Sequence, residues 1–157
     1  MKKSLMVAGV LVVLVVLIFF TQSSGASFET IDAFEGEIEI YKSASCGCCG
    51  IYSEYMKGKV DPKVNVINLM DTYEIKETYG VPQELQSCHT TVVGNYFVEG
   101  HIPLEAVEKL LKENPDIKGI AMPGMPSGSP GMPGGKYSDF VIYAVHHDGS
   151  HSEFMRI

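Results

Sequence analysis

The alternation of apolar and polar residues along the chain predicts four strands. Isoleucines alternate with glutamates over residues 37–41, which predicts a strand with one buried face. Residues 64–69 carry valine, isoleucine and leucine in a similar short run and predict a second strand. Residues 90–93 and 96–99, joined by the turn Gly94-Asn95, predict a hairpin.

Helical spacing appears between and after these strands. Residues 50–59 repeat apolar side chains at intervals of about four and predict a short helix. Residues 71–79 predict a second helix that ends at Gly80. Residues 104–113 predict the clearest helix, with leucines and a valine on one face and Pro103 at its start.

The resulting order is strand, helix, strand, helix, hairpin, helix, and it predicts an α/β fold. A strand–helix–strand unit pairs its strands in parallel through a right-handed crossover, whereas the hairpin adds antiparallel strands. This βαβαββα order is that of a thioredoxin-like core, expected over residues 37–118. Residues 27–36 are expected to form a linker. Residues 119–157 are expected to form a Met/Pro/Gly-rich loop and a β-hairpin that packs on the core or extends its sheet.

The first 26 residues have the pattern of a targeting segment. Lys2 and Lys3 precede an apolar run from Leu5 to Phe20, and small and polar residues follow. The run exceeds the usual apolar region of a signal peptide and falls short of the roughly 20 residues that span a bilayer easily. Residues 1–26 therefore predict a signal peptide or an N-terminal membrane anchor. In both cases the rest of the chain is expected outside the cytoplasm, periplasmic or otherwise exported, either soluble or anchored.

The charge of the chain excludes one class of partner. The net charge is −7, and the two lysines of the leader make the remainder more acidic still. Arg156 is the only arginine, and lysines form no cluster. Nucleic-acid binding is therefore not expected, because it requires positive charge to neutralise phosphates.

Three of the four cysteines lie within four positions, in Cys46-Gly47-Cys48-Cys49. This turn follows the first strand and precedes a helix, whose unpaired N–H groups and dipole favour thiolates. Cys46 and Cys49 have C-x-x-C spacing, which serves both metal binding and disulfide exchange. Cys48 is a liability for exchange because it can scramble the bridge, whereas a metal site uses it.

Three thiolates in one tight turn favour a soft metal ion. Softness selects Cu(I) or Zn(II), and tetrahedral zinc is poorly served by three ligands from one turn. Several Cu(I) ions that share bridging thiolates fit better, so copper is favoured over zinc.

Cys88 is the expected fourth ligand. The segment Ser87-Cys88-His89 precedes the third strand, and in a thioredoxin-like fold it lies beside the dithiol turn, where a proline usually stands. His89 is expected to be an auxiliary ligand or a hydrogen-bond donor to a ligating sulfur. The metal site is therefore expected to contain Cys46, Cys48, Cys49 and Cys88, and no catalytic residue is assigned.

The remaining soft or basic side chains are not assigned to this set. His101 lies between the hairpin and the last helix. His146, His147 and His151 flank the final turn and are expected on the surface. Three loop methionines either pack onto the domain or bind Cu(I) through their thioethers. They are Met122, Met125 and Met132.

Several motifs in this order resemble the domain-of-unknown-function 411 family, which includes CopG-like copper-resistance proteins. The motifs are Tyr41-Lys42-Ser43, Cys46-Gly47-Cys48-Cys49-Gly50, Gly80-Val81-Pro82, Ser87-Cys88-His89-Thr90, Glu99-Gly100-His101-Ile102-Pro103 and the methionine-bearing run 122–132. The resemblance implies a thioredoxin-like fold, copper handling outside the cytoplasm, and Cu(I) bound by the C-x-C-C cysteines with one distal cysteine.

The favoured interpretation is an extracytoplasmic copper-binding protein that sequesters Cu(I) or transfers it to another copper-handling protein. The alternative is a thioredoxin-like protein that exchanges disulfides or changes the oxidation state of copper. A binding function is favoured over an enzymatic one.

Overall fold

The computed structural model describes residues 27–157. The signal peptide or membrane anchor expected in residues 1–26 lies outside this part. Among the helices of residues 27–157, none has the length and apolar character that crossing a bilayer requires.

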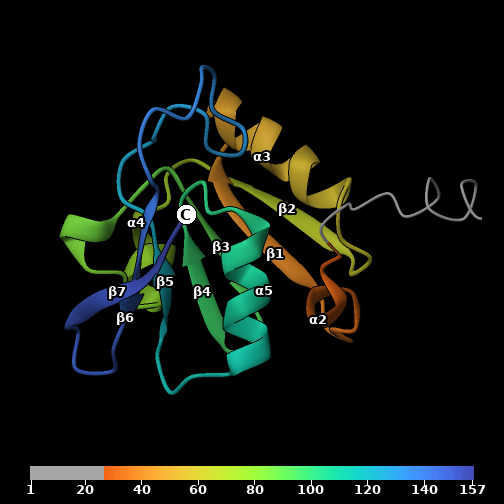
Figure 1. Ribbon diagram of the computed structural model, residues 1–157. Coiled ribbons are helices and arrows are strands. Elements are labelled where there is room, and N and C mark those ends of the chain that lie inside the picture. The colour runs from red at the N-terminus through yellow and green to blue at the C-terminus, as the bar shows by residue number, and fades with distance from the viewer. Residues whose placement is uncertain (1–26) are drawn as a thin grey trace, which may run out of the picture.

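Seven strands form one mixed sheet in the order β2-β1-β3-β4-β5-β6-β7 (Figure 1). β1 pairs in parallel with β2 and antiparallel with β3, and β3 pairs antiparallel with β4. β5 then pairs in parallel with β4, while β6 and β7 follow in antiparallel order. The strands are β1 (Ile38–Ser43), β2 (Val64–Leu69), β3 (His89–Val93), β4 (Tyr96–Glu99), β5 (Gly119–Ala121), β6 (Val141–Val145) and β7 (His151–Arg156).

Helical segments cover both faces of the sheet. The α3 (Gly47–Lys57) and α5 (Leu104–Glu113) helices pack over the larger core, which includes Ile38 and Ile40 of β1. A smaller cluster on the other face contains Phe97 of β4 and residues next to α4 (Tyr73–Thr78) and η1 (Gln83–Leu85). Because side chains alternate along a strand, neighbouring residues of β3 face different layers.

This arrangement confirms the predicted mixed α/β class. The first four strands and their helices follow the predicted βαβαββα order, and their spatial order β2-β1-β3-β4 is consistent with a thioredoxin-like core. The predicted strands, the hairpin and the last helix appear within a few residues of their expected bounds.

Two elements differ from the prediction near the N-terminal part of the core. The helix expected at residues 50–59 begins at Gly47, because Cys46 is its N-cap and its sulfur accepts a hydrogen bond from the Cys49 N–H. Within residues 27–36, where a linker is expected, the structure has the short helix α2 (Glu29–Asp32), which buries Ile31 completely. The Glu108 carboxylate of α5 accepts the N–H groups of Thr30 and Ile31, both at 2.9 Å.

The C-terminal residues extend the same sheet. The predicted hairpin is formed by β6 and β7, and β5, which was not predicted, connects it to β4. The loop between β5 and β6 passes beside the start of α3 (Figure 1). Gly131 has a φ of +81°, and a Cβ there would lie 2.9 Å from the Cys48 carbonyl oxygen. The loop therefore needs glycine at this point in order to approach the cysteine turn.

The packing of α2 predicts that its loss destabilises the domain. Replacing Ile31 by alanine (Ile31→Ala) should lower the free energy of unfolding by about 2–5 kcal/mol, because a fully buried side chain leaves a cavity. Denaturant titration of the purified protein measures this change. Glu35→Ala, at an exposed position in the same segment, is the control and should shift stability by less than about 0.5 kcal/mol. If both substitutions changed the free energy of unfolding by the same small amount, residues 27–36 would be a linker that adds no stability.

Candidate metal centre

The register between β1 and β3 places the cysteine turn beside Cys88. Lys42, near the end of β1, lies opposite His89, the first residue of β3. The chain enters the cysteine turn just after β1 and passes through Cys88 just before β3. The four sulfurs of Cys46, Cys48, Cys49 and Cys88 consequently lie within 4.8 Å of one another. The structure therefore brings the four predicted cysteines together.

Two of the four cysteines are joined in this structure. Cys46 and Cys49 form a disulfide across the first turn of α3, whereas Cys48 and Cys88 are free. Cys49 is fully buried, while the other three are half-buried. The sulfurs of Cys46 and Cys48 are 3.5 Å apart. Thioredoxin-like disulfide exchange requires a disulfide between these two cysteines. A site with four thiolate ligands requires that the disulfide be reduced.

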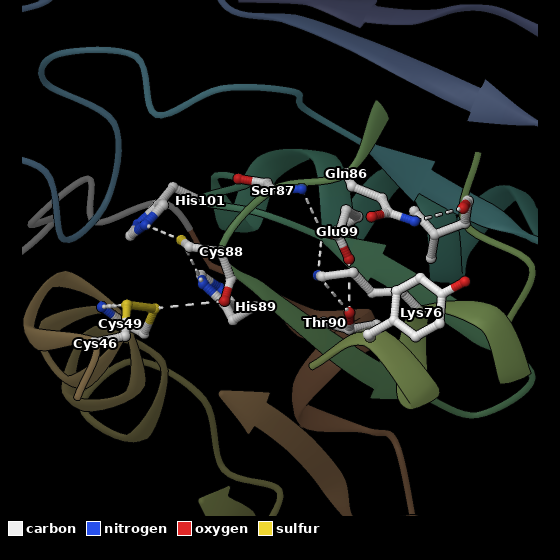
Figure 2. Close-up of polar contacts among 12 residues, drawn as sticks. Cys46, Cys49, Lys76, Gln86, Ser87, Cys88, His89, Thr90, Glu99 and His101 are labelled. Carbon is white, nitrogen blue, oxygen red and sulfur yellow. Dashed lines mark hydrogen bonds and ion pairs between the residues drawn. A yellow bond between two sulfur atoms is a disulfide. The ribbon is translucent and has the colours of Figure 1, made fainter. Parts of the chain in front are cut away.

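Two imidazoles flank the sulfur of Cys88. Figure 2 shows this sulfur between the rings, 3.0 Å from His101 Nε2 and 3.4 Å from His89 Nδ1. Cys49, Cys88, His89 and His101 form a second group whose ligand atoms all lie within 4.8 Å of one another. The site therefore contains nitrogen donors as well as sulfur.

The orientation of His101 is set by a backbone carbonyl. Its Nδ1 lies 2.7 Å from the oxygen of Pro130. Since a carbonyl oxygen only accepts, Nδ1 carries the proton and donates it. Burial lowers the pKa of His101, which favours the neutral ring. Its Nε2 lone pair therefore points at the Cys88 sulfur, in the form that binds metals.

His89 is more enclosed than His101. It is fully buried and stacks against the ring of Tyr52, with ring centroids 4.4 Å apart. Burial, followed by the nearby positive charges, holds its pKa well below the usual value. Within residues 27–157, its Nε2 has no hydrogen-bond partner. The ring is therefore neutral, and its Nδ1 is the nitrogen that faces the Cys88 sulfur.

The Cys88 thiol is protonated in the absence of metal. Burial raises its pKa to about 11, and the neighbouring Cys48 adds to the effect. A metal ion that binds here must displace the proton, as is usual for thiolate sites.

The other residues considered from the sequence lie elsewhere or have different roles. His101 is not in the expected ligand set, and the pairing of β3 with β4 brings it to Cys88. Met122 is buried in the main core, whereas Met125 is 53% exposed. His147 and His151 are exposed beside Asp116 and Glu84. A cavity of about 710 Å³ near the β3–β4 turn contains none of the cysteines and is a separate feature.

The fold and the site together define the class of this protein. It is a mixed α/β domain that carries a cluster of cysteine and histidine side chains at the start of a helix. A family model described as "Protein of unknown function, DUF411" matches residues 85–132. Two solved structures, titled "Copper resistance protein copG", forms 1 and 2, each share 34% sequence identity with this chain. Each structure matches this chain with a TM-score of 0.70. The matches cover 78% and 77% of this chain, and 97% of the chain of each solved structure.

No curated protein matches the chain. The identity and coverage of the solved relatives nevertheless show the family. The chain belongs to the DUF411 family of CopG-like copper-resistance proteins.

The disulfide predicts a specific pattern of thiol labelling. Alkylation of the denatured but unreduced protein should add two labels, on Cys48 and Cys88, and prior reduction should raise the number to four. Mass spectrometry of proteolytic peptides locates the labels. Denaturation removes differences in burial, so each free thiol reacts. Four labels without reduction would show that the isolated protein carries no disulfide.

Proposed function

We propose that this protein binds Cu(I) outside the cytoplasm through Cys46, Cys48, Cys49 and Cys88, and that it sequesters the ion or transfers it to another copper-handling protein. The proposal rests chiefly on the gathering of four sulfurs within 4.8 Å. Thiolates select soft ions, and membership of a copper-resistance family favours Cu(I) over Zn(II). The leader pattern of residues 1–26 supports export.

The crowding of the sulfurs supports more than one copper ion. Four thiolates this close can each bridge two ions, whereas a single tetrahedral zinc ion requires the ligands to spread around one centre. His101 Nε2 and His89 are placed to add nitrogen ligands next to Cys88. We infer that the histidines are auxiliary, because their ligand atoms gather with the sulfurs of Cys49 and Cys88 but not with those of Cys46 and Cys48.

Copper loading of all four cysteines requires the reduced protein. Reduction of the Cys46–Cys49 disulfide takes up two electrons and two protons and yields two thiols. Binding of Cu(I) then releases the thiol protons. The oxidised protein retains only Cys48 and Cys88 as free thiols and should bind Cu(I) less tightly.

Anaerobic titration with Cu(I) in competition with a chelator tests this proposal. The reduced protein should bind Cu(I), and Cys88→Ser should weaken binding by at least about tenfold, which corresponds to about 1.4 kcal/mol. X-ray absorption at the copper edge should show a sulfur-dominated shell with copper–copper contacts. His147→Gln, which changes an exposed histidine, is the matched control and should bind as the wild type does. Equal binding by Cys88→Ser and the control would reject the four-cysteine site.

The disulfide favours one second function, thioredoxin-like disulfide exchange. Cys46 is half-buried at the helix N-cap, and Cys49 is fully buried behind it. In this reaction the Cys46 thiolate attacks a substrate disulfide and releases one substrate thiolate. The Cys49 thiolate then attacks the Cys46 sulfur, which releases the second substrate thiolate and forms the observed disulfide.

Cys48→Ser separates the two functions. Exchange uses Cys46 and Cys49 alone, so the reduced variant should still reduce a small aromatic disulfide at a rate within a few-fold of the wild type. A copper cluster that uses Cys48 should lose affinity in the same variant. Absorbance of the released aromatic thiol measures the first property, and Cu(I) titration measures the second. Loss of exchange with unchanged copper affinity would contradict both assignments of Cys48.

A further inference from the structure

A buried ion pair lies beside the candidate metal centre. Lys76 Nζ of α4 and Glu99 Oε1 at the end of β4 are 2.5 Å apart, and their side chains are 5% and 0% exposed. Within residues 27–157, it is the one ion pair with both partners buried. Removing two charges from water is costly, and a pair of well-packed apolar residues often serves stability as well. Stability alone therefore does not explain why these two charges are buried.

The Glu99 carboxylate holds the chain on both sides of Cys88. It accepts the backbone N–H of Ser87 at 2.6 Å and the hydroxyl of Thr90 at 2.6 Å. Lys76 Nζ also donates to the Thr90 hydroxyl, at 3.2 Å. Figure 2 shows these groups converging on the carboxylate next to Cys88. Because the carboxylate grips the residue before Cys88 and the second residue after it, the Cys88 backbone has little freedom to move.

The same residue also connects Cys88 with His101. Glu99 immediately precedes Gly100 and His101, and the Gly100 N–H donates to the His89 carbonyl at 3.0 Å. Gly100 has a φ of +86°, and a Cβ there would lie 2.9 Å from the Ser87 side chain. The segments that carry Cys88 and His101 thus meet closely at Glu99.

We propose that Lys76 and Glu99 are positioning residues that hold Cys88 where its sulfur meets the cysteine turn and His101. Glu99 supplies the hydrogen-bond acceptors, and Lys76 neutralises the buried carboxylate. The inference deepens the copper-binding function proposed above. It rests on that function only in the experiment that measures copper binding.

Two double variants separate positioning from plain stabilisation. Both K76M/E99Q and K76M/E99L remove the two charges, so neither leaves an unpaired buried charge. Glutamine keeps an amide oxygen that can accept the Ser87 N–H, whereas leucine offers no acceptor. A purely stabilising pair predicts that both variants keep Cys88 in place. A positioning pair predicts that K76M/E99Q resembles the wild type and that K76M/E99L does not.

The first readout is the rate at which iodoacetamide alkylates Cys88 in the folded, unreduced protein. Cys48 of α3 is the internal control, because it is the other free thiol and lies outside the Glu99 contacts. In K76M/E99L, the Cys88 rate relative to that of Cys48 should rise by about tenfold or more, because the segment opens more often. In K76M/E99Q the ratio should stay within about twofold of the wild type. An unchanged ratio in a folded K76M/E99L protein would overturn the proposal.

If K76M/E99L does not fold, the variant Ser87→Pro tests the positioning of Cys88 instead. Proline removes the N–H that Glu99 accepts and leaves the ion pair intact, and Gln86 already has φ −64° and ψ 142°, which suit a residue before proline. Ser87→Ala is its control, since it removes only the hydroxyl that donates to the Gly124 carbonyl. The proposal requires faster alkylation of Cys88 in Ser87→Pro than in Ser87→Ala, and equal rates would refute it.

Copper supplies the second readout. Anaerobic Cu(I) titration of the reduced proteins should show weaker binding by K76M/E99L than by K76M/E99Q, with fewer sulfur neighbours per copper in the X-ray absorption spectrum. If the wild type binds no Cu(I), the proposed function fails, and the alkylation rates still decide whether Lys76 and Glu99 position Cys88.

Discussion

The pairing of β1 with β3 is the constraint on which the site depends. Both strands lie in the interior of the sheet and run antiparallel, so the end of β1 and the start of β3 lie side by side. The chain leaves β1 into the cysteine turn and enters β3 from Cys88. A change of register would separate these two segments, because each residue of shift moves them by about 3.3 Å and turns the side chains to the other face. The geometry of the sulfur cluster is therefore a property of the sheet.

Alternation along β3 divides two tasks between the faces of the sheet. His89 points to the α3 side, where its ring stacks on Tyr52 beside the sulfurs. Thr90 points to the α4 side, where its hydroxyl meets Glu99 and Lys76. His89 thus contacts the site, and the next residue, Thr90, holds the strand in place through hydrogen bonds on the opposite face of the sheet. A buried carboxylate is tolerated there because an ammonium group, a hydroxyl and a backbone N–H compensate it.

Local patterns predicted the elements whose own sequence determines them, and missed those that depend on tertiary contacts. Apolar periodicity was sufficient for α5 and for the β3–β4 hairpin, and the cysteine spacing alone identified the turn. The α2 helix and β5 are too short to show a period, and each exists because a neighbour completes it, as Glu108 does for α2. His101 and Lys76 act through contacts with residues 13 and 23 positions away, which no spacing rule reveals. Glu99 did carry a signal, as a carboxylate that ends a short, otherwise apolar strand.

The two functions proposed for the cysteines would use the same side chains. The distances that bring four sulfurs together for a metal also bring Cys46 and Cys49 close enough to bond. A pair of cysteines joined in a disulfide is lost as thiolate ligands, so disulfide formation and full copper loading would compete for the same sulfurs. Cys88 is a free thiol in this structure, its segment is held by Glu99, and its sulfur faces His101 and His89. In our proposal, Cys88 is therefore the constant member of the site, and the redox state of the α3 turn determines how many sulfurs join it.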